Sequence, residues 1–277
     1  MIIFGGFGNN TLFGGKDNDT LSGESGNDIL RSEDGNDLLD GDAPNPVTGS
    51  AKDTLYGGED NDILSGESGN DILRGEDGND TFEGSQDKDN IDDGDGFDIA
   101  NYSKLGKAIT LSGVGTITKA GRLGTDQVFK VETVIADAGV ANNTIDTSQS
   151  LSGVFISADL KAKTISANNV PSLGILTFNV VNFDNVIGTQ EADSIKGDEQ
   201  NNQLVGNDGN DFIIGRQGDD ILIGGFGADK FIFNSFKEGL DTIKDYTFGQ
   251  NDVIEVSKLG FGTTNINDFY YDVFLER

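Results

Sequence analysis

The 277-residue sequence contains no cysteine and no histidine. Without cysteine, neither a disulfide framework nor a thiolate site is possible. Without histidine, the serine–histidine and cysteine–histidine catalytic pairs, the HExxH zinc site and a histidine general base are all excluded. A protein of this composition that is stable outside a cell therefore needs another kind of cross-link.

Basic residues are also scarce. The chain has 19 Lys and Arg against 48 Asp and Glu, a formal net charge of -29. Such an excess destabilises a compact state through self-repulsion unless something neutralises it. It also excludes nucleic acid and anionic membranes as expected partners, because both are negatively charged.

The sequence has no run of 18 apolar residues, so no membrane-spanning helix is expected. The first residues, MIIFGGFGNN, lack the basic start and long apolar stretch of a cleaved signal peptide. Either the protein stays inside the cell, or its export signal lies elsewhere in the chain.

Glycine is abundant, with 40 residues against 3 prolines, and much of it lies in a repeat. The segment LSGESGNDILR occurs at 21–31 and again at 64–74. Between and around these copies runs a nine-residue period, interrupted by an insertion at 44–51. In the first array the sixth place holds Asp19, Asp28, Asp37, Asp53, Asp62, Asp71, Asp80, Asp89 and Asp98.

The period returns near the end of the chain. In this second array the sixth place holds Asp193, Asn202, Asp211, Asp220 and Asp229. A frayed copy at 5–13 begins the first array, with Asn10 in the sixth place. Fixed-period similarity of this kind is typical of repeat architectures.

The eighth place is large and apolar in both arrays, apart from Ala100 at the boundary. It holds Leu12, Leu21, Leu30, Leu39, Leu55, Leu64, Leu73, Phe82, Ile91, Ile195, Leu204, Ile213, Leu222 and Phe231. The seventh and ninth places are mixed, so each unit predicts a very short strand with one residue pointing inward. One such residue cannot fold a unit alone, but stacked units would build a continuous narrow core.

Stacking would place the turn carboxylates in register on adjacent coils, where they repel one another. A divalent cation between the turns would remove this repulsion through its positive charge. Ca²⁺ suits the position because it accepts six to eight oxygen ligands in flexible geometry. Mg²⁺ demands strict octahedral geometry, and Zn²⁺ prefers the His and Cys ligands that are absent. Where the fourth-place glycine is missing, Asp17, Asp60 and Asp87 replace it, and aspartate tolerates the left-handed conformation relatively well.

GESGNDILR and its neighbours resemble the GGxGxDxUx nonapeptide of the RTX, or haemolysin-type calcium-binding, family. The resemblance implies an all-β fold: a parallel β-roll or β-helix solenoid in two calcium-binding arrays, separated by an irregular β region and followed by a C-terminal β cap. It also implies Ca²⁺ between loops n and n+2, held by the sixth-place carboxylates and by carbonyls of the second and fourth places. The fourth-place candidates are Gly26, Gly35, Gly69, Gly78, Gly209, Gly218 and Gly227.

Carried over to this sequence, the resemblance implies that the loops of certain aspartates share one ion. These are Asp28 with Asp53, Asp53 with Asp71, Asp62 with Asp80, Asp71 with Asp89, and Asp211 with Asp229. We expect about ten ions in all, each contributing two positive charges. Departures from the pattern are expected to weaken particular sites: Asn10, Asn202, Ser32, Asp93 and the insertion at 44–51.

Two other interpretations of the carboxylates are less favourable. A solvated acidic surface has no need of a nine-residue phase. An EF-hand at 93–104 would place Phe97 where an acid or amide is required, and Lys104 where a glutamate is required.

The chain is expected to divide into four regions: the first array at 1–102, the middle segment at 103–187, the second array at 188–232, and a C-terminal capping region at 233–277. Within the middle segment, β-branched residues predict strands in 108–119, 126–136 and 175–188. This segment is either a ligand-binding β domain or an irregular β spacer that leads into the second stack. The family resemblance also suggests an uncleaved C-terminal export signal, with 268–277 as the candidate.

The function that we expect is that of a secreted, extracellular bacterial calcium-binding module that folds on binding Ca²⁺ and has no enzyme activity. The first alternative is the C-terminal portion of a larger secreted enzyme, such as a protease, lipase or polysaccharide-modifying enzyme. The second is an adhesin or surface-layer protein. Calcium is the expected ligand, and extracellular polysaccharide or a cell surface is a possible partner.

Overall fold

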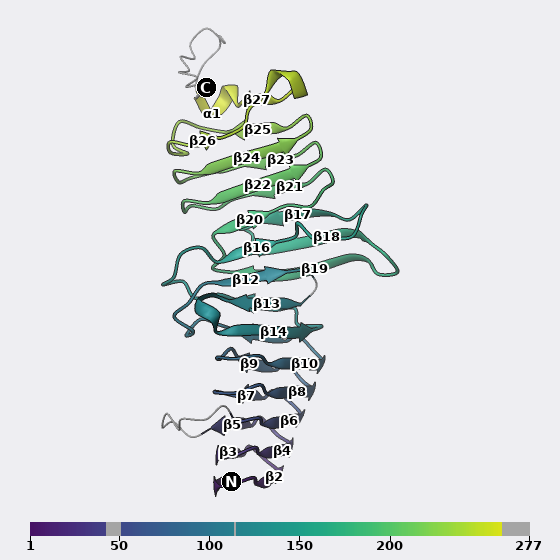
Figure 1. Ribbon diagram of the computed structural model, residues 1–277, viewed down its shortest axis with the longest axis vertical. Helices are drawn as coiled ribbons and strands as arrows, with labels where there is room; N and C mark the ends of the chain where they lie inside the picture. Colours follow the sequence, from purple (N-terminus) through teal and green to yellow (C-terminus); the bar gives the residue numbers. More distant parts are fainter. Residues whose placement is uncertain (43–50, 114, 262–277) are drawn as a thin grey trace.

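The computed structural model describes residues 1–42, 51–113 and 115–261. The chain forms one elongated stack, with the N-terminal strands at one end and the C-terminal strands at the other (Figure 1). The predicted export segment at 268–277 lies outside the described residues, as does the predicted insertion at 44–51 apart from Ala51. Almost all the regular structure is β, arranged in two long sheets.

Successive strands of the arrays alternate between the two sheets, so neighbours within a sheet come from alternate nonapeptides. The 14-stranded sheet contains, in spatial order, β1 (Ile2–Phe7), β3 (Thr20–Ser25), β5 (Leu38–Asp42), β7 (Ile63–Ser65), β9 (Thr81–Glu83), β11 (Ile99–Asn101), β15 (Thr133–Ile135), β19 (Gly174–Val181), β18 (Thr164–Val170), β17 (Phe155–Asp159), β21 (Ser194–Lys196), β23 (Phe212–Ile214), β25 (Lys230–Phe233) and β27 (Val253–Val256).

The second sheet has 13 strands. In spatial order these are β2 (Thr11–Lys16), β4 (Ile29–Asp34), β6 (Thr54–Glu59), β8 (Ile72–Asp77), β10 (Asn90–Asp95), β14 (Gly124–Phe129), β13 (Thr116–Lys119), β12 (Ile109–Ser112), β16 (Thr144–Asp146), β20 (Asn185–Ile187), β22 (Gln203–Asp208), β24 (Ile221–Phe226) and β26 (Thr242–Ile243). The strand pairs within both arrays are parallel, which confirms the predicted parallel β-roll solenoid.

The core is a ladder of eighth-place side chains, as the sequence predicts. Leu39 pairs with Leu64, and Leu64 pairs with Phe82 on the next coil of the same sheet. These three side chains are completely buried. Burying one such side chain stabilises the fold by roughly 1.5–3 kcal/mol, and each rung is held by the rungs on both sides.

The middle segment belongs to the same two sheets, although it lacks the nonapeptide. In the second sheet, β12, β13 and β14 pair antiparallel. In the first sheet, β17, β18 and β19 do the same. Two reversals restore the strand direction, so β14 continues parallel from β10 and β17 pairs parallel with β21.

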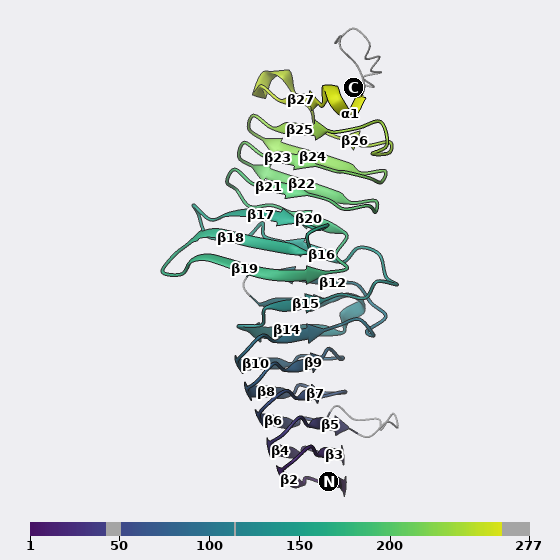
Figure 2. The same ribbon diagram turned by 180° about the vertical axis from the view of Figure 1, so that it is seen from behind.

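The predicted middle strands are confirmed, with more detail than the sequence provided. The segment 108–119 contains the antiparallel strands β12 and β13, 126–136 contains most of β14 and all of β15, and 175–188 contains nearly all of β19 and all of β20. The sequence did not reveal β16, β17 and β18. The longest of the middle strands, β18 and β19, extend beyond the outline of the stack in both views (Figure 1 and Figure 2). β20 pairs parallel with β22, so the middle segment leads directly into the second array, as expected.

The C-terminal end is a β cap. β26 and β27 add the last strand to each sheet, and the short helices η2 (Phe248–Gln250) and α1 (Lys258–Phe261) accompany them. A further single turn, η1 (Ala120–Arg122), connects β13 to β14. In the part of the chain that the structure describes, every helix is too short to cross a membrane.

Candidate metal centres

All 13 sixth-place aspartates predicted as metal ligands are buried. Each lies in the turn directly before its strand, and the backbone N–H of one aspartate donates to Oδ1 of the aspartate one coil further on. These bonds measure 2.6–3.1 Å. The partners are 18 residues apart, or 25 across the insertion. Such a hydrogen bond joins the two aspartates of each predicted ion-sharing pair, and the shared ion itself stays a prediction.

The hydrogen bonds form two columns, one on each side of the roll. In the first array, one column contains Asp19, Asp37, Asp62, Asp80 and Asp98. The other contains Asp28, Asp53, Asp71 and Asp89. The neighbouring backbone thus occupies Oδ1 of each carboxylate in a column and leaves the second oxygen, Oδ2, for another partner.

Most of these second oxygens have no protein partner. Among the described residues, Oδ2 is buried without a hydrogen bond in Asp19, Asp28, Asp37, Asp53, Asp62, Asp71, Asp80, Asp211, Asp220 and Asp229. Buried polar atoms almost always have a partner, and an unpaired buried charge is more costly still. Ten such atoms in regular positions therefore indicate that a ligand satisfies them.

The electrostatics agree. Burial raises the pKa of Asp53 and Asp62 to about 7, and that of Asp71 to about 8. Neighbouring carboxylates contribute to these raised pKa values: Asp42 most for Asp53, Asp80 most for Asp62 and Asp89 most for Asp71. A positive ion among them would have the opposite effect, because an opposite charge favours the ionised form.

Beside nine of these ten oxygens lies the first-place glycine of the same repeat, and in the repeat of Asp37 that place holds Ser32. A Cβ added to Gly23 would lie 2.5 Å from Asp28 Oδ2 and 2.6 Å from the carbonyl oxygen of Gly41 on the next coil. A carboxylate oxygen and a backbone carbonyl therefore converge over this glycine, where no side chain fits. The oxygen-only donor set and the narrow cradle fit a hard cation such as Ca²⁺.

The fourth-place glycines allow the turns to stack closely. Gly35 has a φ of 129°, and a Cβ there would lie 2.7 Å from the carbonyl oxygen of Asp17 on the coil before it. A φ between 124° and 143° is shared by Gly26, Gly35, Gly69, Gly209, Gly218 and Gly227. Gly78 lacks a left-handed φ, and the close carbonyl of Asp60 explains the need for glycine there. That these residues ligate an ion through their carbonyls stays a prediction.

Two predicted ligands already have donors from the protein. Thr189 donates its backbone N–H to Asp193 Oδ2 at 2.6 Å, and its hydroxyl lies 3.1 Å from the same oxygen. Ser85 Oγ donates to Asp89 Oδ2 at 3.1 Å. Both hydroxyl residues occupy the second place of their repeat. A hydroxyl at that place is therefore a signal, visible in the sequence, that the predicted ligand set did not take into account.

At the end of the first array, a buried lysine lies beside the last aspartate of one column. Lys119 Nζ lies 2.6 Å from Asp126 Oδ1 and 3.5 Å from Asp89 Oδ2, and the side chains of all three residues are almost fully buried. Tyr102 donates its hydroxyl to Asp126 Oδ2 at 2.6 Å. At this step of the column, the ammonium group and the phenol satisfy the carboxylates that elsewhere lack a partner.

The columns continue beyond the nonapeptides, and the sequence pattern does not show this. Asp89 N–H donates to Asp126 Oδ1 at 3.0 Å, and Asp98 N–H donates to Glu132 Oε2 at 2.9 Å. In the cap, Asp241 and Asp252 accept the same bond from Asp220 and Asp229. The four acceptors lie outside the nine-residue phase, so the repeat pattern does not identify them.

Comparison with protein families also indicates calcium-binding repeats. The family model described as the RTX calcium-binding nonapeptide repeat matches four times, at residues 4–39, 47–82, 182–206 and 196–231. Among solved structures, the extracellular lipase LipA from Serratia marcescens is similar, with 21% identity and a TM-score of 0.34. The match covers 89% of this chain, which spans only 40% of the lipase. A comparison with curated proteins found no match. Four matches of one family model, which fall on the two nonapeptide arrays and the few residues before the second, show that the arrays of this chain are RTX calcium-binding nonapeptide repeats.

Proposed function

We propose that this chain is a calcium-responsive folding module of an extracellular bacterial protein. The observation that carries the proposal is the set of ten buried aspartate oxygens without a partner among the described residues. Ca²⁺ bound there would neutralise the carboxylates and occupy the oxygen cradles between coils. The residues that would hold the ions are the sixth-place aspartates of each column, together with the carbonyl oxygens that face them.

The ion-free arrays are expected to be unstable. The chain carries a net charge of -29, and each coil adds another carboxylate to a buried column. Burying an isolated carboxylate is strongly unfavourable, and the narrow core has one large side chain per nonapeptide to offset that cost. We therefore infer that the arrays are disordered at low calcium and fold when calcium is supplied.

An extracellular location is consistent with this behaviour. Extracellular calcium modules bind at roughly 10⁻⁴–10⁻³ M, so the arrays would stay unfolded in a low-calcium cytosol and fold after export. The absence of cysteine fits as well, because the ions replace disulfides as cross-links. Type I export, and a polysaccharide or cell-surface partner, stay predictions.

We further propose that this module is structural rather than catalytic. Lys119, Tyr102 and Asp126 are residue types that catalysts use, but all three are buried and support a column instead of facing a substrate. A catalytic module elsewhere in a longer protein stays a prediction.

Calorimetry and circular dichroism test the proposal together. In calcium-free buffer we expect little β signal from the arrays, with a saturable heat and a gain of β signal as calcium is added. Magnesium at equal concentration is the control and should produce neither. An ion-free chain that already has its full β signal would overturn the proposal.

A single aspartate gives a sharper test. Asp71→Asn removes a buried carboxylate that lies between Asp53 and Asp89 in one column. Because ligand charge sets calcium affinity, we expect the calcium midpoint for folding to rise by about tenfold. Asp77→Asn removes the same charge from an exposed position of the next strand and should leave the midpoint unchanged.

A further inference from the structure

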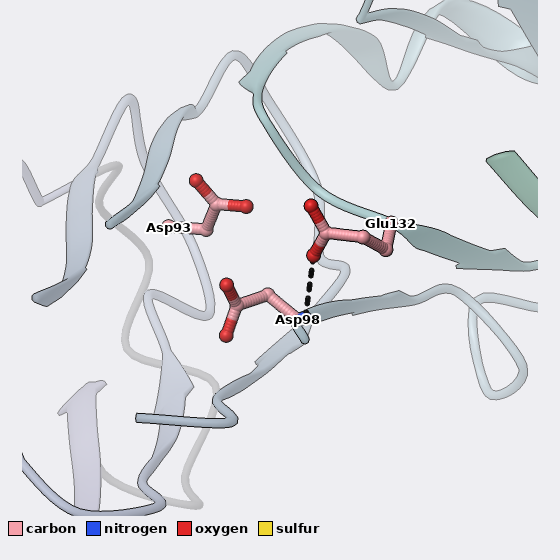
Figure 3. A group of neighbouring side chains, drawn as sticks. All are labelled: Asp93, Asp98 and Glu132. Carbon is pink, nitrogen blue, oxygen red and sulfur yellow. Dashed lines mark hydrogen bonds between the residues drawn. The ribbon is translucent and has the colours of Figure 1, made fainter. Parts of the chain in front are cut away.

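Three carboxylates converge where the first array passes into the middle segment. Asp93 lies in β10, Asp98 directly precedes β11, and Glu132 directly precedes β15. One carboxylate oxygen of each lies within 4.8 Å of those of the other two. Figure 3 shows the three groups facing a common space.

The cluster arises from two departures from the repeat. Asp93 occupies a first place, where the other repeats have glycine or, once, Ser32. Glu132 occupies the next step of the column after Asp98, because it accepts the N–H of Asp98 as the sixth-place aspartates do along the array. We expected Asp93 to weaken its site, but the structure shows that it adds a carboxylate.

One of these groups lacks a partner. Asp93 is 1% exposed, and its Oδ1 accepts the N–H of Gly94 at 2.8 Å. Its Oδ2 has no hydrogen bond from any described residue, and its carboxylate group faces the space that it shares with Asp98 and Glu132 (Figure 3). Burial, followed by the charge of Asp98, raises the pKa of Asp93 to about 7. Asp93 is therefore a buried carboxylate with one unsatisfied oxygen, and the group faces two further carboxylates.

Basic residues of the described chain form no ion pair with the cluster. Lys130 is nearby, but its ammonium group donates to the carbonyl oxygen of Gly94 at 3.1 Å. On the other side of the roll, Lys119 supplies the positive charge at the corresponding step. The two columns of the first array thus end differently, one with an ammonium group and the other with three acidic side chains.

We propose that Asp93, Asp98 and Glu132 form an additional calcium site, distinct from the sites between nonapeptides and tighter than them. Affinity for calcium rises with the number of charged ligands and with the rigidity of the site. Here a third carboxylate joins the pair that a column provides, and two of the three groups are fully buried. The inference rests on the proposed calcium function.

An ion at this position would connect the array to the middle segment. Asp93 and Asp98 belong to the last nonapeptide of the array, whereas Glu132 belongs to the middle segment. The backbone carbonyl of Glu132 also accepts the N–H of Asn179, a residue of β19, at 2.7 Å. Binding at the cluster therefore holds β10, β11 and the start of β15 together.

The test is a calcium titration of the full chain in competition with a chelator of known affinity. Asp93→Gly restores the glycine of the repeat, so the fold should be retained. Glu132→Gln removes the negative charge that the middle segment contributes to the cluster. We expect each variant to weaken the tightest binding step by about tenfold, with the remaining steps unchanged. Asp92→Asn, which removes a charge from the exposed neighbouring residue, is the matched control.

Circular dichroism at saturating calcium would confirm that each variant is folded. If the wild-type chain takes up calcium and Asp93→Gly behaves like Asp92→Asn, the additional site is wrong while the proposed function stands. If the wild-type chain takes up no calcium at all, both are wrong. A loss of the tightest step in Asp93→Gly and in Glu132→Gln, but not in Asp92→Asn, supports the site.

Discussion

The arrays and the middle segment share the same two sheets, but they satisfy their buried polar groups by different means. In the arrays, an aspartate such as Asp62 has one oxygen bound to backbone and the other without a described partner. In the middle segment, Asn143 occupies a comparable interior position, and its amide donates to three backbone carbonyls at 2.9–3.0 Å. Its Oδ1 accepts the N–H of Ile109 at 3.1 Å.

This difference predicts which region relies on a bound ion to satisfy its buried oxygens. An amide carries both donors and acceptors, so Asn143 can complete its hydrogen bonds within the chain. An ionised aspartate only accepts, and a column of aspartates supplies no donors for its own outer oxygens. We therefore expect the arrays to need a cation, whereas in the described part of the middle segment no buried side-chain oxygen or nitrogen lacks a hydrogen-bond partner.

The largest expected effect comes from removing calcium. Hydrogen exchange followed by mass spectrometry should show loss of protection in β4, β6 and β8 when calcium is chelated. The strands β13, β16 and β18 should exchange at least about tenfold more slowly than the array strands under the same conditions. Uniform loss of protection along the chain would contradict the distinction between the two regions.

A smaller effect is expected from pH in calcium-free buffer. The folded-state pKa values of Asp53, Asp62 and Asp71 are raised to about 7, 7 and 8, from an ordinary value of 3.8. Between these limits the folded arrays bind more protons than the unfolded chain, so the free energy of unfolding falls as pH rises from about 4 to about 8. Acidification from about pH 8 to pH 5.5 should therefore increase the β signal of the calcium-free chain.

At saturating calcium the sign should reverse. The ion requires deprotonated carboxylates, so acidification then competes with binding and lowers the free energy of unfolding. Thermal unfolding at several pH values, with and without calcium, measures both trends. The same sign of pH dependence in the two conditions would argue against carboxylate columns as the calcium sites.

The smallest effect concerns one position at the border of the two regions. Lys119→Met leaves Asp89 and Asp126 without their buried positive charge, and breaking such a pair typically costs about 3–5 kcal/mol. We expect a lower free energy of unfolding by chemical denaturation, with a smaller loss at high calcium, where an ion can replace the ammonium group. Lys107→Met, at an exposed position, is the control and should have little effect. If Lys119→Met lowers the free energy of unfolding equally at low and high calcium, the Lys119 ammonium group does not take the place of an ion.

Much of the turn geometry could be predicted from the sequence. Asp17, Asp60 and Asp87 replace fourth-place glycine, and their φ values of 74°, 78° and 68° confirm the expected left-handed conformation. The second place was not foreseen: Glu24, Glu33, Glu67 and Glu76 also have a positive φ, between 61° and 75°. Glutamate is not a residue that favours this region, so the stacking of the coils must impose it.

The sequence by itself determined the repeat, the inward side chain of each rung and the aspartate that precedes it, because these features recur every nine residues. It also indicated calcium, since repeated carboxylates without histidine or cysteine favour a hard cation. Only the tertiary structure decided how the columns end. Asp89 meets Asp126 and Asp98 meets Glu132 across 37 and 34 residues with no common period. Contacts of that kind depend on how the antiparallel strands of the middle segment return to the stack, and no local pattern encodes that path.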